Sequence, residues 1–330
     1  MASNPLVASA VTKLTITKTI PLGSYRSIPF VRVEGMAYGE LSPTENIPDL
    51  ANAPRNARGN VEYQTRVVLI APTDPKQSKG RLLVDVPNRG LPVSHAFYNS
   101  PRQRPLPIGS LDAGLSFLQE QGFMLVSTQW ELGQGFEPPQ FVDEHGETRF
   151  VEGVGFAAVR DMARFLRDSV QSDNPLAGAV KRIYAAGYSQ TSRFLKSFLL
   201  NGFNLVDGGQ IIEGFHLVGG AAGQLPLMAS GAGPGTVAGS TPAPPNLEHR
   251  GVHEEPFTYS AVMATLQARN EPLPKIFVTH FNIDYMGGRA SLTRTGARGM
   301  TDLALPDINF VGDGVGPVHH KMPNHVRAEA

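Results

Sequence analysis

Cysteine is absent from the sequence of 330 residues. This absence excludes disulfide bonds, thiolate metal sites and cysteine nucleophiles. An excess of charge of one sign is also lacking, because 29 Lys and Arg residues balance 29 Asp and Glu residues. A chain without net charge gives no sign of the basic surface that nucleic acids or anionic membranes attract. We therefore expect neither as a partner, and we expect a small, neutral substrate.

Long apolar runs are missing as well, since no stretch approaches the roughly 20 residues that cross a bilayer. The N-terminal sequence MASNPLVASA has no charged segment followed by a sustained apolar core, so it does not resemble a signal peptide. We expect a soluble protein, cytoplasmic by default, although a processed secreted form would look the same. The sequence has no evident linker or internal repeat, which favours a single domain over residues 1–330; the oligomeric state cannot be predicted.

The pattern of apolar residues changes along the chain. Alternating polar and apolar residues at 12–17 and 61–70 predict antiparallel strands, with a loop at 41–48 between them. Further along, continuous apolar runs suit strands buried on both faces, as in parallel sheets. These runs lie at 81–86, 123–127, 183–186, 215–218 and 275–279, and segments such as 155–166 between them have helical spacing. The sequence therefore predicts a mostly parallel central sheet with helices on both faces.

Residues 223–256 interrupt this alternation with Gly, Ala, Pro and Ser. The segment has no Walker spacing, and its glycines do not form a Gly-x-Gly-x-x-Gly motif between a strand and a helix. A nucleotide site is therefore not expected here. We interpret 223–256 as a lid or cap-like insertion that covers a pocket.

A sharp turn at Gly187-Tyr188-Ser189-Gln190-Thr191 joins an apolar run to a stretch of helical spacing. In the order strand, turn, helix, a serine hydroxyl projects from the end of the sheet, and the backbone N–H groups of the turn face any oxyanion formed there. Ser189 is therefore the leading candidate for a nucleophile. The triplet Gly114-Leu115-Ser116 serves as a comparison, because it lies in helical spacing over 111–118 without a preceding strand. Ser116 is expected to be an ordinary helix residue.

A serine nucleophile needs a histidine base that a carboxylate orients, and in doubly wound hydrolases the chain order is Ser, acid, His. Asp284 follows the apolar run 275–279 directly, which places it at the same edge of the sheet as the turn of Ser189. Asp302 and Asp307 precede the next apparent strand and would lie at its opposite end. Asp284 is therefore the predicted acid, the alternative being a loop carboxylate that caps backbone N–H groups.

The base is predicted in the glycine-rich loop after a final strand at 308–312. That loop ends in His319 and His320, of which His319 is the first choice, and the sequence does not separate the two. A metal cluster with His325 has little support, since no recognised ligand spacing is present. We therefore expect neither a metal nor an organic cofactor. His216 and His280 are expected to pack near strand ends.

An oxyanion hole needs two N–H donors. The Gln190 amide begins the helix, where the helix dipole favours negative charge. The second donor is expected from the loop at 87–91, through the backbone of Arg89 or Gly90, because glycine allows close approach; a plain turn is the alternative.

For substrate binding we select Tyr188, next to the nucleophile, and Trp130, the only tryptophan, for which simple packing is equally expected.

The run Gly187-Tyr188-Ser189-Gln190-Thr191-Ser192-Arg193-Phe194-Leu195 resembles the Gly-Tyr-Ser-Gln-Ser-Gly-Arg-Phe-Leu elbow of the α/β-hydrolase domain-containing proteins, an esterase-like group of the α/β-hydrolase superfamily. Asn88-Arg89-Gly90 is similar to that family's Asn-Arg-Gly loop, and Asp284-Tyr285 falls where the family has Glu-Tyr-Trp. The resemblance extends from residue 10 over most of the chain. It implies an α/β-hydrolase fold with Ser189 as nucleophile, Asp284 as acid and His319 or its neighbour as base.

The sequence departs from the family pattern at three places. Thr191-Ser192 replaces Ser-Gly, Asp284 is one methylene shorter than Glu, and the loop at 316–320 is longer than a compact Gly-x-x-His. The sequence therefore predicts a serine hydrolase that cleaves a carboxylic ester through an acyl-enzyme. A lyase or C–C bond hydrolase on the same scaffold is one alternative. A binding protein that keeps the fold without the base is the other.

Overall fold

The structure, a computed structural model, describes residues 9–100, 109–111, 114–220, 222–223, 225, 257–281, 284, 290, 293 and 308–310. The described residues fall into two compact units, the first ending at Arg182 and the second beginning at Ile183. The single domain over 1–330 stays a prediction. Of the predicted lid at 223–256, only Gly223 and Leu225 belong to the described residues.

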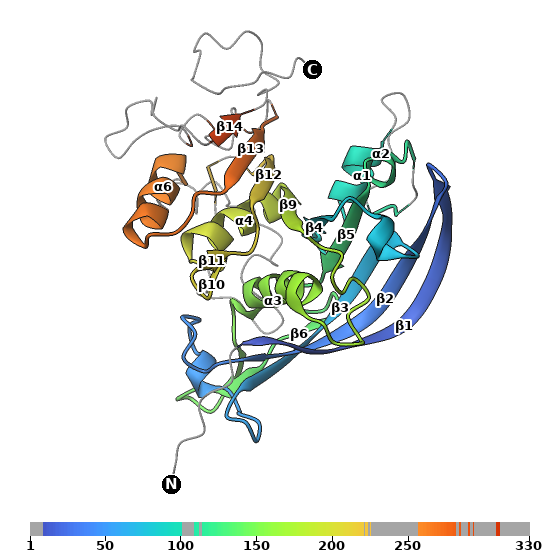
Figure 1. The fold of residues 1–330 in the computed structure, drawn as a ribbon. Helices are drawn as coiled ribbons and strands as arrows, with labels where there is room; N and C mark the ends of the chain where they lie inside the picture. The colour runs from blue at the N-terminus through green and yellow to red at the C-terminus, as the bar shows by residue number, and fades with distance from the viewer. Residues whose placement is uncertain are drawn as a thin grey trace. The chain divides into compact units, whose positions relative to one another are not determined.

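The first unit contains the sheet β1-β2-β3-β5-β4, which can be followed in Figure 1. Its strands are β1 (Ala10–Tyr25), β2 (Ile28–Leu41), β3 (Val61–Pro72), β4 (Arg81–Asp85) and β5 (Phe123–Thr128). β1, β2, β3 and β5 pair antiparallel in turn, and β4 pairs parallel to β5. The predicted antiparallel strands at 12–17 and 61–70 are confirmed. β1 runs further than the alternation indicates, because much of it is exposed and carries no apolar signal, and β2 was not predicted.

Short strands and helices complete this unit. β6 (Phe136–Glu137) pairs with β3, and β7 (Gln140–Val142) pairs with β8 (Thr148–Phe150). The helices are η1 (Leu50–Asn52), η2 (Pro75–Gln77), α1 (Ser94–Asn99), α2 (Phe117–Glu120) and α3 (Val154–Asp168). The helix predicted over 111–118 is wrong. Gly114 and Ser116 both have positive φ, 50° and 53°, so the chain turns there and α2 begins only at Phe117.

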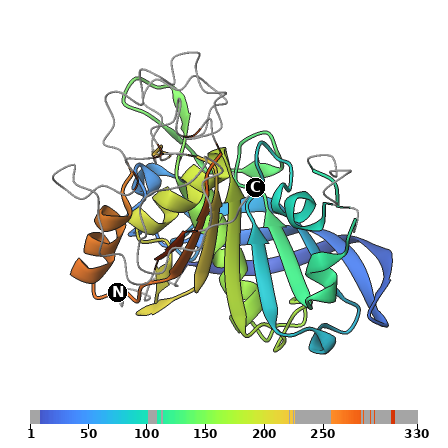
Figure 2. The same ribbon diagram turned by 90° about the horizontal axis from the view of Figure 1, so that it is seen from above.

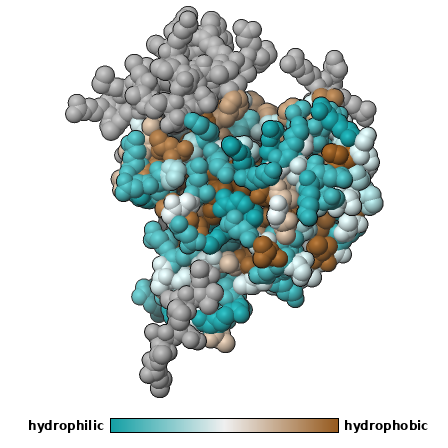
Figure 3. Space-filling model, viewed as in Figure 1, coloured by the Kyte–Doolittle hydropathy of each residue, from teal (hydrophilic) through white to brown (hydrophobic). Residues whose placement is uncertain are grey.

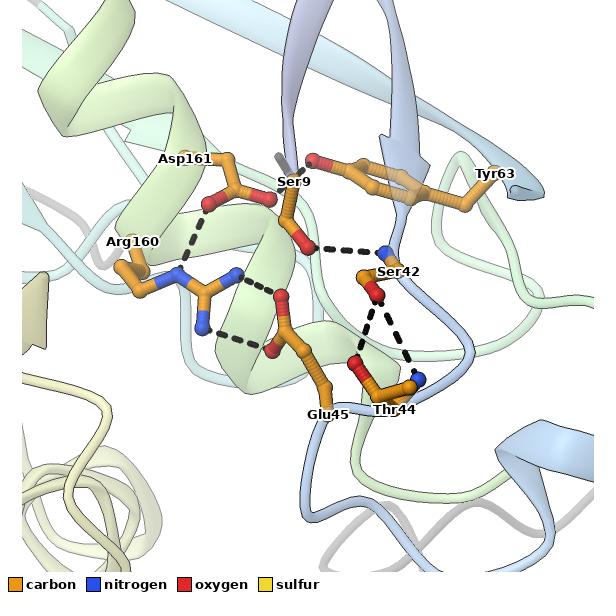
Figure 4. A network of polar contacts seen from close by, with 7 residues as sticks. All are labelled: Ser9, Ser42, Thr44, Glu45, Tyr63, Arg160 and Asp161. Atoms are coloured by element: carbon orange, nitrogen blue, oxygen red, sulfur yellow. Dashed lines mark hydrogen bonds and ion pairs between the residues drawn. The ribbon is translucent and has the colours of Figure 1, made fainter. Parts of the chain in front are cut away.

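The long helix α3 contacts β1, β2, β3 and β5 and is fastened by a polar network (Figure 4). Arg160 donates through both terminal nitrogens to Glu45, at 2.8 and 2.7 Å, and through Nε to Asp161 at 2.7 Å. Tyr63 donates to the other oxygen of Asp161 at 3.2 Å. Burial raises the pKa of Asp161, although the neighbouring guanidinium of Arg160 opposes the rise. The network ties α3 to the loop after β2.

The second unit contains four parallel strands in the order β9-β12-β13-β14, and the views of Figure 1 and Figure 2 show them. They are β9 (Arg182–Tyr188), β12 (Gly214–Val218), β13 (Lys275–Thr279) and β14 (Ile308–Phe310). β10 (Leu205–Val206) and β11 (Gly209–Gln210) form a separate hairpin. The helix α4 (Gln190–Leu200) contacts β12 and α6 (Tyr259–Ala268). The apolar runs at 183–186, 215–218 and 275–279 are therefore parallel strands, as predicted.

Exposed apolar side chains are scattered over the described surface. On the face in Figure 3, hydrophobic residues are interspersed among hydrophilic ones. Isolated exposed apolar residues are normal for folded proteins. No helix among the described residues is long and apolar enough to cross a membrane.

Candidate active site

The turn at Ser189 has the geometry that the sequence predicts. β9 ends at Tyr188 and α4 begins at Gln190, so Ser189 alone makes the turn. Its backbone lies at φ 54° and ψ −108°, a region that costs a non-glycine residue about 1–3 kcal/mol. The side chain is exposed, whereas the three residues that follow are buried. The strained backbone therefore places an accessible hydroxyl at the end of β9.

Backbone bonds hold this strained residue in place. The Ser189 N–H donates to the Val218 carbonyl at 2.7 Å, which ties the turn to the end of β12. The Ser189 carbonyl accepts from Arg193 at 3.2 Å, inside the first turn of α4. The adjacent strand and the helix thus both fix the nucleophile's main chain.

Thr191 closes the turn from the helix side. Its hydroxyl accepts from the Tyr188 N–H at 2.8 Å and donates to the Tyr188 carbonyl at 3.1 Å. A serine hydroxyl can make the same two bonds, so the replacement of the family's Ser by Thr191 keeps the function of this position. The added methyl group is accommodated in a fully buried site.

Glycines allow the segments around the turn to approach closely. A Cβ on Gly187 would lie 2.4 Å from the Thr191 carbonyl oxygen. At Gly220, where φ is +83°, a Cβ would lie 2.8 Å from the Ser189 carbonyl oxygen and 3.0 Å from the Ser192 Cβ. The Cβ that Ser192 brings in place of the family's glycine therefore fits because position 220 has none.

The predicted acid lies just beyond β13. Asp284 is 8% exposed, its Oδ2 accepts from the Phe281 N–H at 2.7 Å, and its own N–H donates to the Phe281 carbonyl at 2.9 Å. Burial raises the pKa of Asp284, but the neighbouring His280, the hydrogen bond from the Phe281 amide and the charge of Lys196 outweigh it and bring the pKa below its ordinary value. Asp284 accepts a bond from a backbone N–H, as the alternative of a capping loop carboxylate predicts. It is also ionised at neutral pH, as the carboxylate of a catalytic triad must be.

His280 is buried directly after the end of β13, as predicted, and it is also a neighbour of the acid, which was not predicted. Its Nδ1 lies 3.7 Å from the Asp284 Oδ2, and its side chain is 6% exposed. The signal in the sequence was the spacing of four residues between a histidine and a carboxylate at the end of an apolar run. His216 also packs as predicted, with its ring in edge contact with Phe277 and its Nε2 3.0 Å from the Thr279 hydroxyl. Burial lowers the pKa of His216 to about 4.

A buried lysine lies on the elbow helix and was also missed. Lys196 is fully buried, and its Nζ lies 4.9 Å from the centre of the Phe257 ring. Burial lowers the pKa of Lys196 to about 7, although the charge of Asp284 favours the protonated form. The apolar spacing of α4 does not indicate that the side chain of Lys196 is buried.

Tyr188 connects the nucleophile turn with the acid loop. Its ring centre lies 5.6 Å from that of Phe281, at an angle of 52° between the planes. Burial and the charge of Asp284 raise the pKa of the Tyr188 phenol. Its role in substrate binding stays a prediction.

The loop predicted to supply the second oxyanion donor belongs to the first unit. Arg89 and Gly90 both have positive φ, 51° and 80°, and Asn88 and Leu91 exchange backbone bonds at 2.8 and 3.1 Å, as in a type I′ turn. Trp130 is 1% exposed, and its indole N–H donates to the Pro87 carbonyl at 2.8 Å. Trp130 therefore fastens the loop. The oxyanion roles of Arg89 and Gly90 and the pocket role of Trp130 stay predictions.

His319 and His320 lie outside the described residues, as do His325, Asp302 and Asp307. Ser189, Tyr188, Gln190 and Asp284 all belong to the second unit, where the Tyr188 ring packs against Phe281 of the acid loop. The roles of these residues and the choice of base stay predictions. Among the described residues, no group of three or more His, Asp or Glu side chains is placed to hold a metal ion.

A parallel sheet with a strand–serine–helix elbow is typical of the α/β-hydrolase fold. Residues 112–258 match the family model described as an alpha/beta hydrolase domain. This chain therefore contains an α/β-hydrolase domain, and both the predicted fold class and the resemblance to this superfamily are confirmed. No curated protein matches the sequence.

Solved structures similar to this chain include esterases. A ligand-bound form of the rice cell wall degrading esterase LipA from Xanthomonas oryzae is 14% identical, with a TM-score of 0.35, over 63% of this chain and 50% of that chain, so the match spans half of LipA. A glucuronoyl esterase from Solibacter usitatus is 13% identical, with a TM-score of 0.40, over 100% and 83%. A putative acetyl xylan esterase from Bacteroides fragilis is 12% identical, with a TM-score of 0.36, over 91% and 69%. Similarity at this level determines neither the substrate nor the reaction of this chain.

Proposed function

We propose that this protein is a serine hydrolase that cleaves a carboxylic ester through an acyl-enzyme intermediate. The observation that carries the proposal is the exposed Ser189, held at φ 54° between β9 and α4 by the Val218 carbonyl and the first turn of α4. Strained backbone persists where the surrounding structure imposes it, and such residues cluster at active sites. A hydroxyl presented by such a turn at a helix N-terminus is suited to nucleophilic attack.

In the proposed reaction, the Ser189 Oγ attacks the ester carbonyl carbon while a histidine takes its proton. The resulting oxyanion accepts from the Gln190 N–H and from the backbone of Arg89 or Gly90. The C–O bond to the alcohol breaks, and the alcohol leaves with the proton from the histidine. Water then attacks the acyl-enzyme through the same base, which releases the carboxylic acid and restores the serine.

The proposed acid is Asp284, which the lowered pKa keeps ionised at neutral pH. An ionised carboxylate can orient an imidazole and stabilise its protonated form. His319 or His320 is the proposed base, as the chain order of the superfamily implies. His280 is the rival for this role, because its Nδ1 already lies 3.7 Å from the Asp284 carboxylate.

The proposal also covers the partners. The substrate is a small neutral ester, bound in part by Tyr188 and Trp130, and the triad needs neither metal nor organic cofactor. Nucleic acid and membranes are not partners, in line with the zero formal net charge. A cytoplasmic location is the working expectation.

A fluorophosphonate probe tests the proposal, because it reacts only with an activated serine. We expect the native protein to be labelled, and we expect Ser189→Ala to abolish the label. Ser116→Ala is the matched control, since Ser116 also follows a Gly-x pair and has a φ of 53°, but no strand leads into it. Product analysis on an ester panel separates ester hydrolysis from lyase and C–C bond chemistry. A folded native protein that stays unlabelled, or a label that survives in Ser189→Ala, contradicts the proposal.

A further inference from the structure

The residue after the nucleophile buries a carboxamide whose two polar atoms are unpaired. Gln190 is 3% exposed. Within the described part of the chain, neither its Oε1 nor its Nε2 has a hydrogen-bond partner. Buried side-chain polar atoms are mostly paired, and an unpaired one costs free energy that a ligand can recover by supplying the missing bond. An unpaired donor and an unpaired acceptor on one planar group therefore call for a polar ligand.

The position of Gln190 identifies that ligand as part of the substrate. Gln190 is bonded to Ser189 and is the first residue of α4. Its backbone N–H is the proposed donor to the ester oxyanion, so its side chain begins next to the carbonyl group of the bound ester. The carbons nearest that carbonyl belong to the acyl group, which stays attached to Ser189 after the alcohol has left.

Other buried polar side chains of the elbow helix do not have these properties. Thr191 is bonded to Tyr188 through both of its hydroxyl functions. Lys196 lies over the Phe257 ring. The Ser192 hydroxyl has no partner in the described structure either, but it packs against backbone, since it would lie 3.0 Å from a Cβ on Gly220. Gln190 alone of these four combines unpaired polar atoms with direct attachment to the nucleophile.

We propose that the Gln190 side chain binds a vicinal diol on the acyl group, so that the substrates are esters of 2,3-dihydroxylated carboxylic acids. A carboxamide offers a donor and an acceptor side by side. One hydroxyl of a diol donates to the Oε1, and the oxygen of the adjacent hydroxyl accepts from the Nε2. A plain alkanoyl group leaves both atoms unpaired in the complex. This inference rests on the proposed serine hydrolase function.

The experiment compares two matched methyl esters, 2,3-dihydroxybutanoate and butanoate, by kcat/KM in the native enzyme and in Gln190→Met. Methionine has a similar length and no hydrogen-bonding amide. We expect the native enzyme to prefer the diol ester beyond the ratio seen in base hydrolysis, and we expect Gln190→Met to reduce that preference about tenfold or more. The ratio of the two kcat/KM values within one enzyme is compared, because a general loss of activity caused by a disturbed oxyanion hole lowers both values and cancels in the ratio.

Gln267→Met is the matched control, because it makes the same chemical change at an exposed position of α6. Ser192→Ala controls for loss of an unpaired buried polar atom two residues away. Both controls should keep the native ratio. Should Gln190→Met not fold, Gln190→Leu is the second variant, and we expect it to lose the preference too, since an alkyl side chain offers the diol neither a donor nor an acceptor.

A native ratio no greater than that of base hydrolysis, or a ratio that is unchanged in the folded Gln190 variants, overturns the inference. So does a preference found only when the diol is in the alcohol, as in 2,3-dihydroxypropyl butanoate compared with propyl butanoate. These outcomes differ from failure of the proposed function, in which Ser189→Ala still hydrolyses the esters.

Discussion

His280 and Asp284 are neighbours in the acid loop, with 3.7 Å between the His280 Nδ1 and the Asp284 Oδ2. Both side chains are buried. Two roles for the histidine fit this distance. As a positioning residue, it holds the carboxylate that orients His319 or His320, and as the base it receives the proton itself.

Single alanine variants of His280, His319 and His320 separate these roles. Loss of a general base typically lowers the rate 10²- to 10⁴-fold. We expect one of His319→Ala and His320→Ala to lower kcat/KM by about 10³-fold, and His280→Ala to lower it by about tenfold with a shifted pH profile. If His280→Ala has the largest effect while both other variants remain active, His280 is the base and the assignment by chain order is wrong.

Gly220 provides a test of the close packing around the elbow. Alanine there meets both the positive φ of +83° and the Ser189 carbonyl oxygen 2.8 Å away. We expect Gly220→Ala to reduce the free energy of unfolding by about 3 kcal/mol and to lower activity, because the turn must shift. The measurement is urea denaturation together with kcat/KM.

Gly208→Ala is the control for backbone strain alone, since Gly208 has a φ of +77° and nothing within 4 Å of its Cβ position. We expect it to cost about 1 kcal/mol and to leave activity intact. Equal losses of stability in the two variants would show that the contact with Ser189 has no energetic effect.

The Thr191 hydroxyl is expected to stabilise the elbow through its two bonds to Tyr188. Thr191→Val keeps the shape but leaves the Tyr188 N–H without its acceptor, which should cost about 1–3 kcal/mol of unfolding free energy. Thr191→Ser restores the hydroxyl found in the family's elbow and should retain most of the native stability. Chemical denaturation of the three proteins checks this, and a valine variant as stable as the native protein contradicts it.

Lys196 makes stability depend on pH in a defined window. Its pKa is about 7 in the folded protein, against 10.5 as the ordinary value, because burial disfavours its charge. Between these values the unfolded chain binds more protons, so the native free energy of unfolding should rise with pH relative to Lys196→Met. We expect a relative gain of roughly 1 kcal/mol per pH unit between pH 7 and 9.5. Urea denaturation at several pH values measures it, and a constant difference refutes the lowered pKa.

The sequence predicted those features that depend on local patterns. Fully apolar runs predict the parallel strands β9, β12 and β13, and the Gly187–Thr191 elbow predicts the turn of Ser189, because periodicity and turn chemistry act over a few residues. The helix over 111–118 failed for the same local reason, since two residues with positive φ break a pattern that otherwise has helical spacing.

Long-range features were not predictable in this way. Lys196 lies over the ring of Phe257, a residue far from it in the sequence. The Ser192 side chain has room because Gly220, in the loop after β12, has no Cβ. No residue near Ser192 in the sequence indicates this contact. Likewise, only the three-dimensional structure shows that the carboxamide of Gln190 is buried without a hydrogen-bond partner.

The residue that carries the acyl group in the covalent intermediate tests the proposed mechanism most sharply. The protein is incubated with p-nitrophenyl acetate, quenched in acid and mapped by peptide mass spectrometry. We expect one acetyl group on the peptide that contains Ser189, and none on that peptide in Ser189→Ala. Acetylation at another residue only, or ester turnover with no acyl group on Ser189 under single-turnover sampling, contradicts it.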